Sequence, residues 1–363
     1  MKSVRLGNFI EEHCEKNKKG EDIPVFSVTN TNGFCTEYFS KDVSSKDKSN
    51  YKIVHKGFFA YNPSRINVGS VDWLRNEEKV IVSPLYNVFS VSPELEKQYL
   101  YYFLKSERGK TLIKSKAEGS VRDNLKFSIL ADFPIPLPSI EEQQKFVAKL
   151  DKASKLILKY KRLLEYYDSL IKSRFIEMFG DPVKNSLGWE VRKLKETTDI
   201  ITGNTPSRKD KENYGTFIEW IKTDNITDKT YITTAAEYLS EKGEMLGRTV
   251  EAGSILMACI AGSLRSIGRV ALTDRKVSFN QQINAIVPKK YNSLFLYALF
   301  QNTQSYAQST VNMALKGILS KGKLEELEYI LPPIELQNNF ATFVQQIDKS
   351  KFEIEKIVKM VYN

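Results

Sequence analysis

Cysteine, histidine and long apolar runs are all scarce in this chain of 363 residues. The three cysteines are an odd number without a pairing rhythm, which favours a reducing compartment over a disulfide scaffold. No apolar run approaches the ~20 residues that cross a bilayer, and Ile255 to Ala261 is better interpreted as a buried strand. The N-terminal stretch lacks the apolar centre of a signal peptide. We therefore expect a cytoplasmic protein.

The scarcity of histidine also limits catalytic and metal-binding chemistry. His13 and His55 stand far apart in the sequence, and no spaced second ligand pair accompanies them, which argues against a zinc site. Gly262 and Gly268 are one residue too far apart for a phosphate-binding loop, and Arg269 stands where that loop requires lysine. We therefore predict a non-catalytic chain with no metal site and no cofactor site.

Proline and glycine are absent from Ser139 to Phe179, and this absence allows a long helix. Ser139 followed by Glu142 is a capping box, in which the hydroxyl and the carboxylate satisfy amide donors of the first turn. Apolar residues recur every seven positions, as in a coiled coil, in one set of Leu150, Ile157, Leu164, Ile171 and Met178 and a second set of Phe146, Ala153, Tyr160 and Tyr167. At ~1.5 Å per residue, this pattern predicts a rod of roughly 60 Å that needs a partner.

The segment from Leu331 to Val361 repeats this central segment. Residues Leu137, Pro138, Ile140, Glu141 and Gln143 match Leu331, Pro332, Ile334, Glu335 and Gln337 at one spacing, 331 − 137 = 194. The seven-residue period continues in Phe340, Ile347, Ile354 and Val361, and in Phe343, Ser350 and Ile357. We expect helices 139–179 and 334–361 to pack antiparallel, with a domain at each end. The second helix is more than two turns shorter, so the pattern alone does not predict pairing along the full rod.

The regions before the two helices repeat as well. Ile23 to Asn30 and Ile218 to Asn225 resemble strands and both end in asparagine, while LYYFLKSERGKTLIKS is matched by LYALFQNTQSYAQST. A strand is also predicted over Val80 to Val91, and a helix over Glu94 to Ala117. The predicted fold class is α+β, with two pseudo-repeated domains separated by two long antiparallel coiled-coil helices. The predicted segments are domain 1–133, helix 134–182, domain 183–330 and helix 331–363.

Four segments together resemble the specificity subunit of type I restriction–modification systems, and the resemblance covers the whole chain. They are the helix starts PLPSIEEQQKF and LPPIELQNNF, the segment SRFIEMFGDP (Ser173 to Pro182), and ITGNTPSRKDKENYGTFIEWIKTDNI (Ile201 to Ile226). The resemblance implies two target-recognition domains, each of which reads one half of a bipartite double-stranded DNA target. It also implies two methyltransferase (modification) subunits as partners, which bind S-adenosylmethionine and methylate adenine N6, and restriction subunits that join them.

Polar, glycine-rich loops carry the candidate DNA contacts, because arginine and asparagine can form two bonds with guanine and adenine respectively. The candidates are Asn62, Ser64, Arg65, Asn67, Arg122, Asn124 and Lys126 in the first domain, and Thr205, Ser207, Arg208, Lys209, Arg265, Lys316 and Lys321 in the second. Arg65 and Arg265 are favoured, since both follow a predicted strand in corresponding loops. Charge decides little: 21 basic against 17 acidic residues in 1–138, and 20 against 16 in 183–333, also fit a slightly basic surface.

Two other classes of function fit the same repeat. The chain could be a stand-alone DNA-binding regulator whose duplicated domains read a pseudo-palindrome. It could also be a coiled-coil adaptor that does not bind DNA. Co-purification with a methyltransferase would favour the specificity subunit over both, and salt-dependent DNA binding by the isolated chain would exclude the adaptor.

Overall fold

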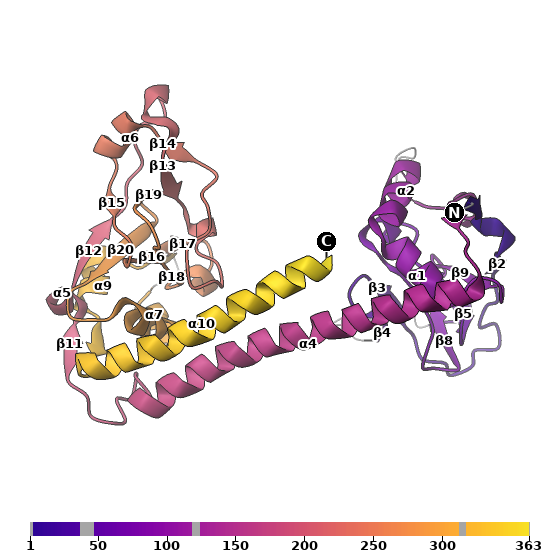
Figure 1. Ribbon diagram of the computed structural model, residues 1–363, viewed down its shortest axis with the longest axis horizontal. Helices are drawn as coiled ribbons and strands as arrows, with labels where there is room; N and C mark the ends of the chain where they lie inside the picture. Colours follow the sequence, from indigo (N-terminus) through magenta and orange to yellow (C-terminus); the bar gives the residue numbers. More distant parts are fainter. Residues whose placement is uncertain (1–2, 37–46, 118–123, 312–316, 363) are drawn as a thin grey trace. The chain divides into compact units, whose positions relative to one another are not determined.

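A computed structural model describes residues 3–36, 47–117, 124–311 and 317–362 of the chain (Figure 1). The chain divides into two compact units, unit 1 (Met1–Leu156) and unit 2 (Ile157–Asn363). Both units mix helices with mainly antiparallel strands, which confirms the predicted α+β class. Among the described helices, none combines the length and the apolar character that a bilayer crossing requires.

Unit 1 is built of short strands followed by helices. Its elements are β1 (Ser3–Arg5), η1 (Leu6–Asn8), β2 (Ile10–His13), β3 (Ser27–Thr29), β4 (Gly33–Cys35), β5 (Lys52–His55), β6 (Phe59–Tyr61), η2 (Ile66–Val68), β7 (Val71–Trp73), β8 (Lys79–Val82), β9 (Asn87–Val91), α1 (Lys97–Lys105), α2 (Glu107–Ala117), α3 (Phe127–Ala131), β10 (Pro134–Pro136) and the first part of α4 (Ile140–Phe179).

Unit 2 begins within α4 and repeats this arrangement with more strands. Its further elements are β11 (Val191–Lys193), α5 (Leu194–Thr197), β12 (Thr198–Thr202), η3 (Lys211–Asn213), β13 (Tyr214–Ile221), η4 (Thr223–Asn225), β14 (Tyr238–Leu239), α6 (Glu241–Leu246), β15 (Thr249–Val250), β16 (Ile255–Ala258), β17 (Ile260–Ala261), η5 (Leu264–Ser266), β18 (Val270–Leu272), β19 (Val277–Phe279), β20 (Ile283–Pro288), α7 (Ser293–Asn302), α8 (Gln304–Ser309), β21 (Gly317–Ile318), α9 (Lys321–Glu326), β22 (Glu328–Ile330) and α10 (Ile334–Tyr362).

The internal repeat appears as one strand order used twice. The central sheet of unit 1 has the order β2-β9-β6-β7, and that of unit 2 has the order β12-β20-β16-β18. All six pairings in these two sheets are antiparallel. Phe59 lies opposite Phe89 in the first sheet, and Ile255 lies opposite Ile286 at the same place in the second. The duplication inferred from sequence is therefore a duplication of topology.

Three sequence predictions need correction within unit 1. Residues 134–136, assigned to the helical segment, form β10 and pair with β1 in the domain. The predicted strand Val80–Val91 is two strands, β8 and β9, separated by a turn at Ser83–Tyr86, because Pro84 cannot donate to a strand ladder. The predicted helix 94–117 is likewise broken at Ser106 into α1 and α2.

The start of α4 is held by the predicted capping box and by a buried glutamine. Glu142 accepts a hydrogen bond from the Ser139 N–H at 3.1 Å, and the Ser139 hydroxyl accepts one from the Glu142 N–H at 3.3 Å. Gln143 is fully buried. Its amide donates to the carbonyls of Glu94 and Pro138, both at 3.0 Å, and accepts from the Glu96 N–H at 2.8 Å. These bonds join the first turn of α4 to the segment that precedes α1.

Gln337 occupies the same place at the start of α10. It is also fully buried, donates to the Pro332 carbonyl at 2.8 Å and accepts from the Asn292 N–H at 2.9 Å. Asn292 is the N-cap of α7, the counterpart of α1. The repeated Leu-Pro and Gln of the sequence therefore mark one structural device, a buried amide that fastens each long helix to its domain. This buried amide with its main-chain partners is the glutamine clamp.

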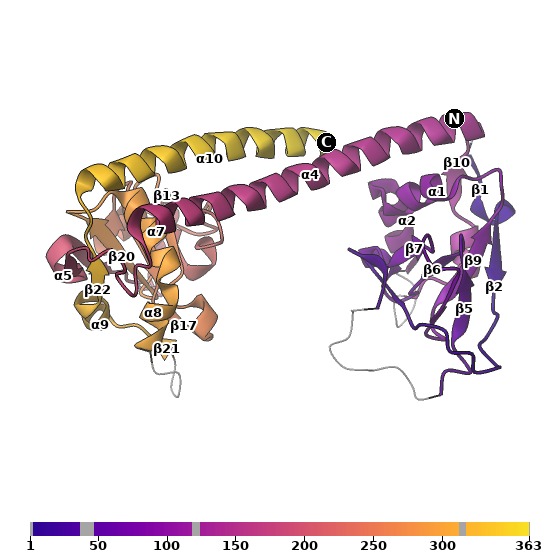
Figure 2. The ribbon, with the colours of Figure 1, turned by 90° about the horizontal axis from the view of Figure 1, so that it is seen from below.

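Within unit 2, α10 lies along the second part of α4 in both views (Figures 1 and 2). Phe175, late in α4, contacts Phe340, early in α10, with ring centroids 5.5 Å apart. Asp168, earlier in α4, pairs with Lys351, later in α10, at 2.6 Å. The two helices are therefore antiparallel over this stretch, as predicted. They have 40 and 29 residues, so α10 can accompany only part of α4.

Burial along the two helices follows the predicted period unevenly. The predicted α4 residues that are partly buried are Ala153, Ile157, Tyr160, Leu164, Tyr167, Ile171 and Met178. Phe146 and Leu150 remain 40% and 44% exposed. On α10, Phe340 and Ile354 are buried and Ile357 is exposed, while the side chain of Val361 lies outside the described part. Phe175 and Phe179 of α4 are both fully buried next to α10, and Phe175 stands one position after the predicted series stops at Arg174.

Phe175 therefore provides a direct test of the helix contact. Its ring is fully buried among Phe179, Phe295 and Phe340. We expect Phe175→Ala to destabilise unit 2 by about 3–5 kcal/mol, because a buried aromatic ring is replaced by a cavity. Ile176→Ala, on the exposed side of the same turn, is the matched control. Equal shifts of the denaturant midpoint for the two variants would contradict this packing.

Candidate nucleic-acid interface

A groove of about 610 Å³ opens on unit 1 where three loops meet. The loops are the β3–β4 hairpin, the β6–β7 connection and the β8–β9 turn. The lining residues are Ser27, Val28, Thr29, Asn30, Asn62, Ser64, Arg65, Asn67, Val68, Ser70, Ser83, Leu85 and Tyr86. Four predicted contacts, Asn62, Ser64, Arg65 and Asn67, thus lie together. These residues form the unit 1 groove.

The β6–β7 connection presents its polar side chains because its backbone is tightly turned. The Asn62 carbonyl accepts from the Arg65 N–H at 3.0 Å, and the Asn62 side chain accepts from the Ser64 N–H at 3.1 Å. The turn closes when the Ser70 N–H donates to the Arg65 carbonyl at 3.1 Å, which Gly69 permits with its φ of +95°. Arg65 and Asn67 are exposed on this turn.

The segment before α3 lies against the same turn. The Ser64 hydroxyl donates to the Asn124 side chain at 2.5 Å, and the Leu125 N–H donates to the Pro63 carbonyl at 3.1 Å. Tyr61 adds a bond from its hydroxyl to the Leu125 carbonyl at 3.0 Å. Burial raises the pKa of Tyr61, so its hydroxyl remains a donor. Asn124 and Lys126 are thus placed beside the groove loop, whereas Arg122 lies outside the described residues.

The two other loops of the unit 1 groove were not predicted from the sequence. The Val28 N–H donates to the Tyr86 hydroxyl at 3.3 Å, and the Ser70 hydroxyl donates to the Val28 carbonyl. These bonds bring together segments that are far apart in the sequence. One signal was available, because Asn30–Asn32 followed by Gly33, with its φ of +60°, is typical of a short hairpin loop and places Asn30 directly after β3.

In unit 2, Arg265 occupies the position that corresponds to Arg65. Each arginine lies in the loop that joins the last two strands of its four-stranded sheet. The loop around Arg265 is held on α8, since the Gln304 amide donates to the carbonyls of Arg265 at 3.2 Å and Ile267 at 2.8 Å. The Gln308 amide adds a bond to the Leu264 carbonyl at 2.8 Å. The Arg265 side chain itself is exposed.

The other unit 2 candidates are divided between two places. Thr205 donates to Gln281, which follows β19, and Ser207 and Lys209 are exposed in the same loop. Lys321 begins α9, where it pairs with Glu325 at 3.5 Å, and no hydrogen bond within the described ranges joins it to the other candidates. Lys316 lies outside the described residues.

Arg208 differs from its neighbours because its charge is already used within unit 2. It pairs with Glu237 at 2.7 Å and lies over the rings of Tyr214 and Trp220, at 5.1 and 5.3 Å. The hydrogen bond that Arg208 donates to Glu237 raises the pKa of Arg208. These contacts fold the side chain back on its own domain, so Arg208 is a weaker candidate for DNA contact than Arg265.

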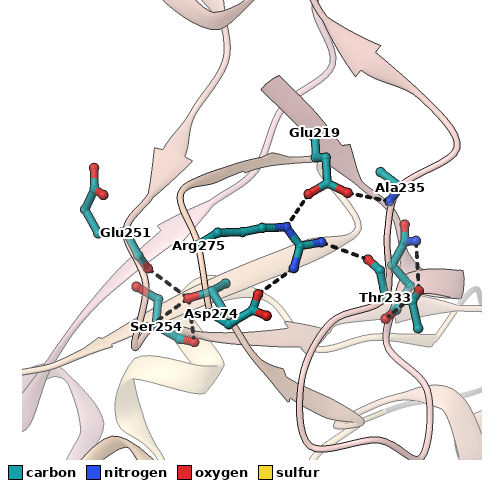
Figure 3. Close-up of polar contacts among 9 residues, drawn as sticks. Glu219, Thr233, Ala235, Glu251, Ser254, Asp274 and Arg275 are labelled. Atoms are coloured by element: carbon teal, nitrogen blue, oxygen red, sulfur yellow. Dashed lines mark hydrogen bonds and ion pairs between the residues drawn. The ribbon is translucent and has the colours of Figure 1, made fainter. Parts of the chain in front are cut away.

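Arg275 shows the same internal use of charge more fully (Figure 3). Its guanidinium donates to Glu219, to Asp274 at 2.5 Å and to the Thr233 carbonyl at 3.4 Å. Burial acts to raise the pKa of Glu219, but the bonds from Arg275 and from the Ala235 N–H outweigh it and lower that pKa. Within the described ranges, no cluster of His, Cys, Asp and Glu could hold a metal ion.

Comparison with known proteins gives one family for both units. The family described as "Type I restriction modification DNA specificity domain" matches residues 4–165 and 186–360. The specificity subunit of the HindI type I restriction enzyme of Haemophilus influenzae is 34% identical over 138 residues, which are 37% of this chain and 28% of that protein. The MjaVIII specificity subunit of Methanocaldococcus jannaschii is 24% identical, and the alignment covers 99% of this chain and 90% of that protein.

Two solved structures share the fold. One is a chain from a study of complex assembly and conformational transition of the type I R-M system, with a TM-score of 0.58, 16% identity, and coverage of 99% of this chain and 96% of that one. The other is the type I restriction–modification S subunit from M. genitalium, with a TM-score of 0.57, 15% identity, and coverage of 99% and 92%. Since the family match covers most of the chain and both copies of the repeat, this chain belongs to the type I restriction–modification DNA specificity family.

Proposed function

We propose that this chain is the specificity subunit of a type I restriction–modification complex, and that each unit reads one half of a bipartite DNA target. The observation that carries the proposal is the duplicated sheet, β2-β9-β6-β7 and β12-β20-β16-β18, with an exposed arginine in the same loop of each copy. Two copies of one reading domain suit a target with two halves. The family match favours this function over a stand-alone regulator and over an adaptor that does not bind DNA.

The proposed complex includes two methyltransferase subunits, to which restriction subunits are added, and it acts in the cytoplasm. The chain itself is non-catalytic in this proposal, and S-adenosylmethionine binds the methyltransferase subunits. Phe146 and Leu150, in the unit 1 part of α4, support a helix-docked partner, because they are 40% and 44% exposed. Large apolar side chains gathered on one exposed helix are typical of protein interfaces.

The direct test is methylation mapping. The chain is co-expressed with the methyltransferase gene of its operon, and the host genome is sequenced by a single-molecule method that detects N6-methyladenine. We expect methylation at one motif with two half-targets and a fixed spacer, and no methylation when the gene for this chain is deleted. Unchanged methylation after the deletion would contradict the proposed function.

Arg65 and Arg265 should act on different halves of that motif. We expect Arg65→Ala to weaken recognition of one half-target by ~1–3 kcal/mol if the contact is bidentate to a guanine, and Arg265→Ala to weaken the other by a similar amount. Methylation rates are measured on targets with one half scrambled at a time. Arg208→Ala is a useful comparison. The Arg208 guanidinium is bound to Glu237, so its removal should have little effect on the recognition of either half-target. Equal losses on all targets would mean that Arg65 and Arg265 contact phosphates.

The spacer between the half-targets provides a further prediction. If α4 sets the distance between the reading surfaces, four residues inserted after Lys155 add ~6 Å and rotate one unit by only ~40°. Because duplex DNA rises ~3.4 Å per base pair, the preferred spacer should lengthen by about one or two pairs.

Two residues inserted at the same place rotate one unit by ~200°, which turns its reading surface away from the groove and should abolish methylation. The methylation rate of each insertion variant is measured on a library of targets that differ in spacer length. An unchanged spacer preference after the four-residue insertion would show that α4 does not set the distance.

A further inference from the structure

Asn30 and Asn225 hold the same place in the repeated sequence, at the ends of IPVFSVTN and IEWIKTDN, but their side chains differ in use. Asn225 is 8% exposed, and its amide is fully bonded. It donates to the Thr233 hydroxyl at 3.1 Å and the Thr234 carbonyl at 3.0 Å, and accepts from the Lys222 N–H at 3.0 Å. Asn225 therefore has a structural role within unit 2.

The Asn30 side chain is instead exposed and lines the unit 1 groove. Within the described residues, no hydrogen bond uses its amide group, and the bond that Asn30 makes is through its main-chain carbonyl. Asn62 and Arg65 of the β6–β7 connection line the same groove. The Asn30 amide thus faces the same opening as the arginine already favoured for base contact, with a donor and an acceptor that remain to be satisfied.

Lys105, the last residue of α1, fixes where Asn30 lies. Its ammonium group donates to the Asn30 carbonyl at 3.1 Å and to the Gly69 carbonyl at 2.5 Å, so one side chain joins both walls of the unit 1 groove. The ammonium also lies 5.5 Å from the centre of the Tyr101 ring. Burial lowers the pKa of Lys105, whereas the nearby Asp72 carboxylate acts to raise it. A half-buried side chain at the end of α1 therefore joins the two loops.

Among the described residues, this bridge has no counterpart at the matched position of unit 2. In the repeat, Gln301 stands where unit 1 has Lys105, within the matched stretches LYYFLK and LYALFQ. The Gln301 amide donates to the Tyr297 hydroxyl at 2.6 Å on its own helix. In unit 1, the unused amide of Asn30 is thus accompanied by a bridging lysine. In unit 2, where the amide of Asn225 is fully bonded, glutamine stands in place of that lysine.

We propose that Asn30 is a specificity-determining residue that reads an adenine edge in the half-target of unit 1, and that Lys105 is its positioning residue. Asparagine is the side chain that pairs with adenine N6 and N7 through two bonds, and a two-bond contact requires its backbone to be fixed. The Lys105 bridge supplies that fixed backbone. This inference rests on the proposed function, because it requires that unit 1 reads duplex DNA.

The test uses the full complex with its methyltransferase and duplex targets in which each base pair is changed singly. We expect Asn30→Ala to reduce discrimination at one adenine-containing pair by roughly 5- to 100-fold, the range of a two-bond contact. The other half-target should be unaffected. Lys105→Gln places at this position the residue that unit 2 has there, and it should reduce discrimination at the same base pair. Lys105→Arg keeps the positive charge and should retain most of that discrimination.

Lys114→Gln is the matched control, because it removes the same charge from an exposed position on α2. A thermal melt of each variant shows whether it is folded. Because Asn30 is exposed, Asn30→Ala should fold and tests the base contact even if Lys105→Gln does not fold. A uniform loss over all targets with Asn30→Ala, or losses in both halves, would overturn the base contact. An effect of Asn30→Ala without any effect of Lys105→Gln would overturn the positioning role. A wild-type complex without target preference would overturn the proposed function itself.

Discussion

The buried amide at the start of each long helix is the constraint on which the rest of the structure depends. Gln143 and Gln337 are both fully buried, and an unsatisfied buried amide costs about 1–3 kcal/mol. Each amide is satisfied only when the helix starts in one position against its domain. The direction of α4 relative to unit 1, and of α10 within unit 2, is thereby fixed by short hydrogen bonds. The apolar contact of Phe175 with Phe340 then stabilises a helix pair whose starting direction is already set.

Periodicity and capping chemistry allowed the helices to be predicted from sequence, because both act over a few neighbouring residues. The Ser139–Glu142 box forms as expected, and the predicted helix 139–179 is observed as Ile140–Phe179. The role of Phe175 was missed because it belongs to the core of unit 2, and its partner Phe295 is distant in the sequence. Strand ends and helix breaks were missed where one local feature, such as Pro84, outweighed the pattern around it.

The candidate site was predicted only in part, and the division has a physical reason. Asn62, Ser64, Arg65 and Asn67 lie in one turn, so a polar loop after a strand was enough to find them. Asn30 joins the same groove only through the folded sheet and the Lys105 bridge, neither of which leaves a local pattern. Arg208 illustrates a different limit, since a basic residue in a polar loop can also be bound to its own domain, here by Glu237.

The glutamine clamp has a consequence for how such chains can change. On the domain side, the clamp contacts main-chain groups: the Glu94 carbonyl, the Glu96 N–H and the Asn292 N–H. Main-chain groups are the same whatever side chains surround them. A domain with different loops, and even different strands at its edges, can therefore be attached to the same helix if it offers those groups in the same place. The attachment of a domain to its helix therefore does not depend on the side chains that line the groove. The same pair of helices can carry a different domain, and the chain can thereby acquire a new target.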